Sequence, residues 1–427
     1  MNTRRLTSLL FVALAWGAGT SHLHAQPPLP TAPPTYDATK DRLSGLTLAD
    51  LARLAPQLER GPVALVEFSD TDAGELPGIH LAVRVHAAPG ELAALVGNPA
   101  GYPRFLRTLD EVTGVRDEGA TRIYDWAWKI GLFRLSGRNA MTKLSPPPER
   151  PDAGWRFAID AQGGDFGVGR MIIRVLPEAA SPHTALLLLS MRMDLRRSNY
   201  IVRQMAKATR SINRSANMSL AYAMALGFRR EAEQRAGYVP PVGTVTELKR
   251  PLVKTRTLIP LLLRGDLVTM DMAGDELHQV AVFGLIFRTP THIREIMLDA
   301  NAFGAALVPG SEAHVVAREG RVTTFDWSID LPLVGAAGRM QMRDDGPVLA
   351  IDATGGALEG GEWRFETKAV SKRATMVSGW ASFDLRRSTW LVRALADADP
   401  YLGHGMTAAS EVMLVRALRT QSHDRKE

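Results

Sequence analysis

The most informative feature of the sequence is a series of segments that occurs twice. The segment RMDLRRSNYIVRQM, at residues 192–205, returns as SFDLRRSTWLVRAL at residues 382–395. Three further pairs match in the same order: LAPQLERGPVALVEFSD from Leu54 with LIPLLLRGDLVTMDMAG from Leu258, YDWAWKIGLFRLSGRNAM from Tyr124 with FDWSIDLPLVGAAGRMQM from Phe325, and FAIDAQGGDFGVG from Phe157 with LAIDATGGALEGG from Leu349. The shared order indicates that a whole domain is duplicated. Two copies are too few for a solenoid, which needs roughly three or more units.

The chain is long enough for two separate cores. Its 427 residues exceed the ~100–200 residues of a typical domain, and its composition, 45% apolar and 22% charged, is ordinary for a globular protein. We expect one domain at residues 46–236 and a second, more divergent one at 250–420. The segment GYVPPVG breaks the pattern inside an expected linker at 237–249, and residues 421–427 form a polar tail.

The N-terminal segment is expected to lie outside both domains. Arg4 and Arg5 precede the short apolar run LTSLLFVALAWGAG, and Ala25 offers a small residue for cleavage, as in a secretory signal peptide. We therefore expect residues 1–25 to be removed and residues 26–45 to form a proline-rich tether. The mature protein would then be periplasmic or secreted.

Composition excludes several kinds of chemistry. Cysteine is absent, which rules out disulfides, thiolate metal sites and a cysteine nucleophile. The formal net charge of +6 is modest and no nucleic-acid motif is present, so nucleic acid is not an expected partner. The positive excess fits either solubility or contact with an anionic lipid surface or ligand.

The first copy predicts an antiparallel α+β fold. The strand HLAVRVHA, from His80, leads to a short helix opened by Ala88-Pro89, and Asn98-Pro99 separates it from a second short helix. Turn signals and apolar alternation then predict six strands and a long helix: strands near residues 112–116, 121–130, 135–145, 155–161, 168–176 and 183–195, and a helix over about 198–236. Hairpin-length connections cannot make parallel crossovers, so the sheet is expected to be antiparallel.

The segment VRVHAAPGELAALVGNPAGYPRFLRTLDEVTGVRD, at residues 83–117, resembles the N-terminal signature of the START-like (SRPBCC, Bet v 1-type) superfamily. It is particularly similar to the polyketide cyclase and coenzyme Q-binding branch. The matching elements are Ala88-Pro89, Asn98-Pro99 and Tyr102-Pro103; the second copy keeps Pro290 and has Phe303 in place of Tyr102. The resemblance implies two helix-grip folds, each a curved antiparallel sheet around a long C-terminal helix. It also implies an apolar cavity for a lipid, sterol, polyketide or quinone-like ligand.

The repeated DLRRS segment falls where the last strand leads into the long helix. Ser198 and Ser388 are expected to be helix N-caps, with the aspartate of each segment paired to a neighbouring arginine. Alternatively, Arg196 and Arg386 lie at the mouth of the cavity and bind an anionic headgroup. The duplication fits both interpretations.

The two long helices differ in sequence. In the first, basic residues form one stripe that is either a solvated face or a contact with anionic lipid headgroups: Arg196, Arg203, Lys207, Arg210 and Arg214. In the second, Pro400, Gly403 and Gly405 interrupt the pattern, so this helix is expected to stop near Ala398 and resume near Thr407. The break is either a hinge for ligand entry or drift in a copy that only supports the other.

Several aromatic and basic residues are candidates for ligand binding. Strand periodicity puts Trp126 and Trp128 on one face and Asp125 on the other, so the tryptophans are either core residues or cavity walls. Arg138 forms either a structural ion pair or one that orients a polar ligand group. The candidate set is Tyr102, Phe105, Trp126, Trp128, Arg138, Arg196, Trp327, Arg339 and Arg386.

No motif of a known catalytic type is found. GxSxG, HExxH and acid-rich metal motifs are absent, the glycine runs lack the context of a phosphate loop, and the histidines are isolated. We expect no catalytic residue, metal or cofactor, and interpret the chain as an exported carrier or sensor of a hydrophobic ligand. The alternative is a cyclase- or dehydratase-type enzyme that acts on an apolar polyketide-like substrate in the same cavity. It would use a titrating pair that faces the cavity, for instance Asp125 and Arg138 with a nearby histidine or tyrosine.

Overall fold

The computed structural model of the chain describes a defined set of residues: 43, 45–68, 78–130, 133–165, 168–179, 181–195, 203, 210–241, 247–305, 311–329 and 335–424. They belong to one compact unit, Thr35–Glu427. The expected signal peptide and the candidates Arg196 and Ser198 lie outside the described residues. Below, the first half means residues 46–236 and the second half residues 250–424.

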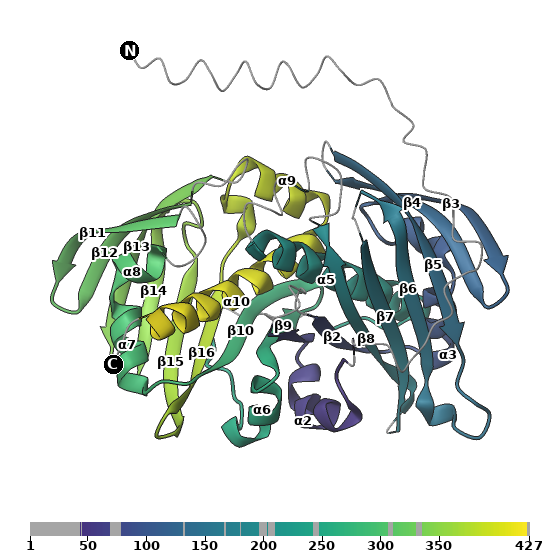
Figure 1. Cartoon of the computed structure of the whole chain (residues 1–427), viewed down its shortest axis with the longest axis horizontal. Helices are drawn as coiled ribbons and strands as arrows, with labels where there is room; N and C mark the ends of the chain where they lie inside the picture. Colours follow the sequence, from purple (N-terminus) through teal and green to yellow (C-terminus); the bar gives the residue numbers. More distant parts are fainter. Residues whose placement is uncertain are drawn as a thin grey trace, which may run out of the picture. The chain divides into compact units, whose positions relative to one another are not determined.

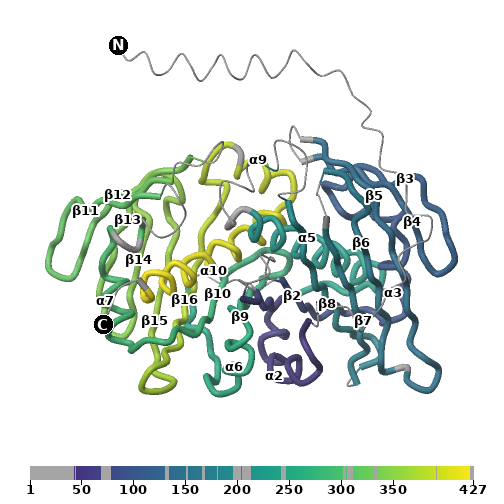
Figure 2. The backbone as a smooth tube through the Cα atoms, viewed as in Figure 1, coloured from purple at the N-terminus to yellow at the C-terminus, as the bar shows by residue number. Residues whose placement is uncertain are grey.

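The two halves have the same order of elements (Figures 1 and 2). The first half contains α2 (Leu48–Leu58), β1 (Val63–Glu67), β2 (Ile79–Val85), α3 (Pro89–Val96), the 3-10 helix η3 (Pro99–Arg104), β3 (Leu109–Glu118), β4 (Thr121–Ile130), β5 (Phe133–Leu144), the 3-10 turn η4 (Pro151–Ala153), β6 (Trp155–Gly164), β7 (Val168–Glu178), β8 (Ser181–Asp194) and α5 (Arg210–Arg235). The two short helices and the six strands after them are confirmed within a few residues. The preceding α2 and β1 were not predicted.

The second half repeats this arrangement. It contains α6 (Thr255–Leu262), β9 (Gly265–Ala273), β10 (Glu276–Ile286), α7 (Pro290–Leu298), α8 (Ala300–Ala305), β11 (Ser311–Glu319), β12 (Val322–Ile329), β13 (Ala336–Asp345), β14 (Val348–Gly356), β15 (Glu362–Ser371), β16 (Ala374–Ser382), the 3-10 turn η6 (Leu385–Arg387), α9 (Trp390–Ala398) and α10 (Pro400–Asp424). The repeat recognised in the sequence is therefore a repeat of structure.

All strands belong to one antiparallel sheet. Its order is β11-β12-β13-β14-β15-β16-β10-β9-β1-β2-β8-β7-β6-β5-β4-β3, so each half contributes eight adjacent strands. In each half the long helix packs on the strands nearest the centre, α5 on β2 and β8 and α10 on β10 and β16. Each half is therefore an antiparallel sheet that holds a C-terminal helix, and the α+β fold class expected from the sequence is confirmed.

The halves join through β1 and β9 with a symmetric register. Ala64 faces Val268, and these residues occupy the same position in the two copies when Leu54 is aligned with Leu258. The neighbouring pairs follow the same two-fold relation. Two identical chains in an isologous dimer would pair in this way. The junction therefore resembles a dimer interface whose two subunits are fused in one chain.

Two hydrophobic layers cover opposite faces of the strands at this junction. Alternation along β1 sends Ala64 and Val66 into the larger core, which contains α5 and α10. It sends Val63 and Leu65 into a smaller core, where α2 and α6 contribute Leu54 and Leu258 among others. The unpredicted α2 and β1 thus supply both the pairing edge and its apolar cover.

An ion-pair cluster ties the last helix to this junction. Asp266 in β9 is fully buried and pairs with Arg416, at 2.9 Å, and with Arg419 of α10. Arg416 also donates a hydrogen bond to the backbone oxygen of Glu67 in β1. A buried carboxylate needs such partners to offset its loss of hydration.

The break in the second long helix is shorter than expected. α9 ends at Ala398 as predicted, but α10 begins at Pro400, so the expected restart near Thr407 is wrong. Proline is tolerated there because the first helical position needs no backbone donor. A Cβ on Gly405 would come within 2.5 Å of Ser219 Cα, so this glycine lets α10 approach α5 closely. The glycine was interpreted as a helix breaker and is instead a helix contact.

The DLRRS segment of the second half has a structural role. Asp384 accepts a hydrogen bond from the backbone N–H of Arg386 and pairs with its guanidinium at 2.9 Å, which confirms the expected pairing. The N-cap of α9 is Thr389, whereas Ser388 closes the 3-10 turn η6, so the expectation for Ser388 is wrong. A 3-10 turn lies between strand and helix, and α9 starts one residue later than an N-cap at Ser388 would give.

Candidate functional site

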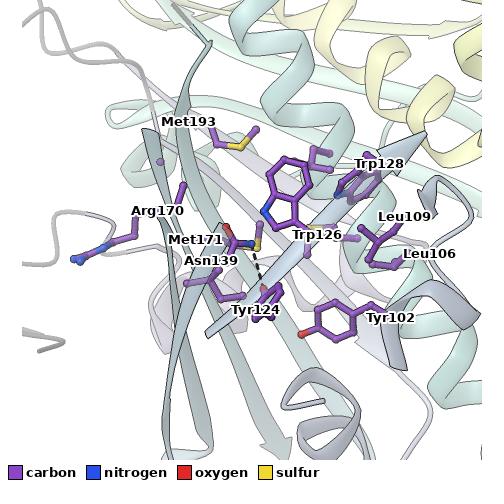
Figure 3. A pocket seen from close by; sticks show the side chains of 15 residues that line it. Tyr102, Leu106, Leu109, Tyr124, Trp126, Trp128, Asn139, Arg170, Met171 and Met193 are labelled. Atoms are coloured by element: carbon purple, nitrogen blue, oxygen red, sulfur yellow. Dashed lines mark hydrogen bonds between the residues drawn. The ribbon is translucent and has the colours of Figure 1, made fainter. Parts of the chain in front are cut away.

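A pocket lies inside the first half, between its strands and α5 (Figure 3). Its free volume is about 70 Å³, and most of its wall is apolar. The lining residues are Tyr102, Leu106, Leu109, Tyr124, Trp126, Trp128, Asn139, Ile159, Ala161, Gly169, Arg170, Met171, Met193, Leu220 and Met224. The candidates Tyr102, Trp126 and Trp128 are therefore brought together at this pocket.

Strand β4 supplies the aromatic wall. Its alternation sends Tyr124, Trp126 and Trp128 inward, where all three are buried. Gly137 of β5 lies opposite Trp126, and a Cβ there would come within 2.4 Å of the indole ring. A larger residue at this position would displace the tryptophan.

Tyr102 enters from η3 and is fixed by its neighbours. Its hydroxyl donates a hydrogen bond to the backbone oxygen of Val96, and its ring meets Phe228 edge-on at 5.1 Å. Burial raises the pKa of this hydroxyl well above its ordinary value, so it stays neutral. Phe105 packs against the same two rings, at 5.9 Å from Tyr102 and 5.4 Å from Phe228, and is not one of the lining residues.

The pocket contains one polar pair within its aromatic wall. The side-chain amide of Asn139 donates to the Tyr124 hydroxyl oxygen at 3.2 Å (Figure 3). The hydroxyl accepts in this bond, so its own hydrogen stays available, and the described residues provide no acceptor for it. Burial raises the pKa of Tyr124 to about 12 despite the lowering effect of Asn139. Tyr124 is therefore a neutral hydrogen-bond donor, and sequence analysis missed it because Tyr124 and Asn139 stand on different strands.

One arginine lines the pocket, and it is not one of the candidates. Arg170 of β7 pairs with Asp160 of β6 at 2.6 Å, where the two residues face each other in register. The recurrence of Asp160 in the repeat was the available signal. Nothing in the sequence named its partner, because strand pairing decides it.

The candidate arginines that are described form ion pairs away from the pocket. Arg138 pairs with Asp125 at 2.6 Å, and Arg339 pairs with Asp326 at the equivalent place at 2.7 Å. Arg386 pairs with Asp384 at the surface. None of these three arginines is a lining residue, and Asp125, the expected partner in proton transfer, is not one either.

Trp327 occupies in the second half the position of Trp126. It faces Gly338 as Trp126 faces Gly137, and it is buried in the large core. Its indole nitrogen is buried and has no hydrogen-bond partner among the described residues. The structure thus places this candidate in an equivalent interior position.

The described residues contain neither a metal-binding cluster nor a membrane-spanning helix. No group of three or more histidine, aspartate or glutamate side chains is arranged to hold a metal ion. None of the helices in that part of the chain is long and apolar enough to span a membrane.

No protein-family model matches the chain, and no curated protein sequence matches it significantly. Solved structures to which it is similar include the di-domain aromatase/cyclase StfQ from the steffimycin biosynthetic pathway. That structure is 9% identical, with a TM-score of 0.28, and the match covers 81% of this chain and 98% of StfQ.

Two further structures cover less of the chain. The STAR-related lipid transfer protein from Xanthomonas axonopodis is 11% identical, with a TM-score of 0.32, over 41% of this chain and 94% of its own. The Zhui aromatase/cyclase from Streptomyces sp. R1128 is 16% identical, with a TM-score of 0.29, over 38% of this chain and 98% of its own. The order and pairing of the elements described above give this chain two helix-grip folds in tandem.

Proposed function

We propose that the first half binds an apolar ligand in its pocket and that the chain acts as a carrier or sensor. One observation carries the proposal: a mostly apolar pocket whose wall includes a neutral hydrogen-bond donor, the Tyr124 hydroxyl. Ligand sites are typically concave and mostly apolar, with a few polar groups that fix orientation. The aromatic wall would supply affinity and Tyr124 the orientation.

The size of the pocket indicates how the ligand enters. A volume of about 70 Å³ is well below the ~300–1,000 Å³ of sites for drug-sized ligands. Three methionines, Met171, Met193 and Met224, line it. Methionine side chains have several rotatable bonds and adapt to irregular shapes. We infer that the pocket widens by rearrangement of these methionine side chains when a ligand binds.

The titratable groups support binding over catalysis. Tyr102 and Tyr124 are held neutral by burial, and Arg170 is committed to Asp160. General acid–base catalysis needs a group whose pKa lies near the working pH and which reaches the substrate. Among the described lining residues none meets both conditions.

Native mass spectrometry of the purified chain tests the proposal. The protein is analysed as isolated and after incubation with a panel of apolar probes that includes aromatic ketones and aliphatic ketones. We expect a bound small molecule, or uptake of one probe per chain, and loss of uptake in Ala161→Phe, whose ring fills the pocket from β6. Wild-type protein that stays empty with every probe would refute the proposal, provided its melting temperature shows that it is folded.

We further propose that residues 1–25 are a signal peptide and that the mature protein is exported. The support is the sequence pattern of basic residues, apolar run and Ala25. Full-length chain expressed in a bacterium with two membranes should be recovered from the periplasm with a new N-terminus near residue 26. An uncut chain in the cytoplasmic fraction would contradict export.

The basic stripe on the first long helix stays a prediction. Arg210 and Arg214 lie on α5, while Arg196 and Lys207 are outside the described residues. Cosedimentation with vesicles that contain anionic lipid, compared with neutral vesicles, would measure whether the stripe binds a membrane surface.

A further inference from the structure

In the second half, larger side chains stand at two positions that border the pocket of the first half. Strand register makes the correspondence unambiguous: Met171 faces Ile159 and Met191, and Trp363 faces Ile351 and Ala381 at the same positions of the repeat. Met193 corresponds to Phe383, because each directly precedes a DLRRS segment. The two methionines of the pocket wall are thus replaced by two aromatic residues.

These two aromatic rings form a stack inside the second half. The rings of Trp363 and Phe383 are 5.0 Å apart between centroids and inclined by 26°. Trp363 is buried, and its indole N–H donates to the carboxyl of Glu411 on α10 at 2.9 Å. The fold therefore accommodates stacked flat rings between its sheet and its long helix at this position.

We propose that the ligand of the first half is a flat aromatic molecule that carries a hydrogen-bond acceptor, and that its ring occupies the space which Trp363 and Phe383 fill in the second half. This inference rests on the proposed function and narrows it to a ligand class. The acceptor, such as a carbonyl oxygen, accepts a hydrogen bond from the Tyr124 hydroxyl. An aliphatic chain of equal length is a poorer ligand.

The pocket walls favour a ring over a chain. Tyr124, Trp126 and Trp128 present aromatic surfaces, which gain from stacked or edge-on contact with another ring beyond the area they bury. The thioethers of Met171 and Met193 also line the pocket and can make favourable sulfur–aromatic contacts with a bound ring. A rigid ring also loses less conformational freedom on binding than an alkyl chain does.

The polar pair is specific to the first half. Tyr124 corresponds to Phe325 and Asn139 to Met340, so the second half lacks both the donor and the amide that orients it. The half whose pocket is described is thus the half with a hydrogen-bonded tyrosine hydroxyl in its interior at this position. This coincidence is expected if the donor serves a ligand and not the fold.

Three matched probes test the ligand class. 2-Acetylnaphthalene has a flat ring system and a carbonyl, 2-ethylnaphthalene has the ring without the carbonyl, and 2-dodecanone has the carbonyl without the ring. Binding is followed by native mass spectrometry and by isothermal titration of the full chain. We expect 2-acetylnaphthalene to bind one per chain and 2-dodecanone to bind at least tenfold more weakly.

Variants then locate the ring and its acceptor. Tyr124→Phe should weaken 2-acetylnaphthalene by roughly fivefold, the worth of one hydrogen bond, and leave 2-ethylnaphthalene unchanged. The double variant Met171→Trp with Met193→Phe gives the first half the rings of the second and should abolish binding of both aromatic probes. The control Met171→Leu with Met193→Leu conserves volume and should keep binding.

The outcomes separate this inference from the proposed function. If 2-dodecanone binds as tightly as 2-acetylnaphthalene, the aromatic class is wrong while a hydrophobic-ligand function stands. If the tryptophan–phenylalanine double variant still binds the aromatic ketone, the ring lies elsewhere and the inference fails. If no probe of any class binds the folded chain, the proposed function fails as well.

Discussion

The two halves of this chain have the same backbone fold and differ in the side chains of their interiors. They have the same strand order, the same register and the same glycine opposite a buried tryptophan. Around the pocket of the first half, the residues of the two copies differ in size and polarity: Tyr124 against Phe325, Trp128 against Ile329, Asn139 against Met340, Met171 against Trp363 and Met193 against Phe383. At these positions the two copies therefore differ in side chains on β4, β5, β7 and β8 and not in the order of their elements.

The second half contains a buried carboxyl beside the aromatic stack. Glu411 is fully buried, and its only described hydrogen bond comes from Trp363, while its second oxygen has no partner. Burial raises the pKa of Glu411 to about 8 against the lowering effect of that hydrogen bond, so the group is largely protonated at neutral pH. In the pocket of the first half, the Tyr124 hydroxyl stays neutral, and the one charged lining residue, Arg170, is paired with Asp160. We therefore expect stability to depend on pH through Glu411 and not through Tyr124.

The largest contrast is expected from truncating the aromatic stack. Trp363→Ala should lower the free energy of unfolding by ~3–5 kcal/mol, because it opens a cavity in a filled interior and removes the partner of Glu411. Met171→Ala at the equivalent position should cost about 2 kcal/mol or less, since that side chain is half-buried and already borders free space. Urea titrations of both variants measure the difference. Equal losses would mean that the two interiors are equally filled.

The next contrast is the dependence of stability on pH. The pKa of Glu411 is about 8 in the folded chain and ~4.3 in the unfolded chain. Between these values the unfolded carboxyl has lost its proton and the folded one has kept it. The free energy of unfolding therefore falls as pH rises, by at most about 1.4 kcal/mol per pH unit, and levels off above about pH 8.

Glu411→Gln isolates this effect. Glutamine keeps an acceptor for the Trp363 N–H but cannot ionise, so this part of the pH dependence should disappear and the variant should be more stable than the wild type near pH 8. Glu319→Gln, an exposed carboxyl on β11, is the control and should leave the slope unchanged. Identical slopes in wild type and Glu411→Gln between pH 5 and pH 8 would show that Glu411 does not titrate in this range.

A close helix contact between the halves gives the third prediction. Gly405→Ala should destabilise the chain by ~1–3 kcal/mol, because its Cβ would overlap the backbone of α5 at Ser219. Gly90→Ala, in the first turn of α3, has open space around the new Cβ and should stabilise by up to about 1 kcal/mol. If Gly405→Ala behaves like Gly90→Ala, α5 and α10 do not pack closely at that point.

The positions of the helices and strands were predicted from the sequence better than the pairing between strands. Alternation and turn residues located the six strands after η3 within a few residues, because both signals are local. The capping box of Thr47 and Asp50 is also a local signal but was not recognised. For this reason α2 and β1, which join the halves, were not predicted. The pairing of β1 with β9 connects residues far apart in the chain, and no local pattern encodes it.

The site shows the same limit. Aromatic residues on one face of β4 pointed to the pocket wall, and Tyr102 followed from the family resemblance. The arginines were expected near a ligand because they recur, but those described recur as ion pairs: Arg138 with Asp125 and Arg339 with Asp326. Tyr124 and Asn139 were overlooked because their hydrogen bond links β4 and β5 across the sheet. The arginine–aspartate pairs recur in both copies and stabilise the shared fold. Tyr124 and Asn139 differ between the copies and are therefore the candidates for a function of one copy alone.

The smallest effect on stability is expected from a double substitution that gives the first half two residues of the second. Tyr124→Phe combined with Asn139→Met gives the first half the residues of the second at these positions and removes both partners of one hydrogen bond together. Removing both partners leaves no buried polar group unpaired, so the free energy of unfolding should change by about 1 kcal/mol or less.

Discrimination between a carbonyl-bearing aromatic probe and its hydrocarbon analogue should nevertheless disappear in this double variant. Isothermal titration with both probes measures it. The single variant Asn139→Met, which keeps the Tyr124 hydroxyl, should retain most of the discrimination. If the double variant still prefers the carbonyl compound, another group recognises the acceptor, and the difference between the halves at these two positions has no bearing on binding.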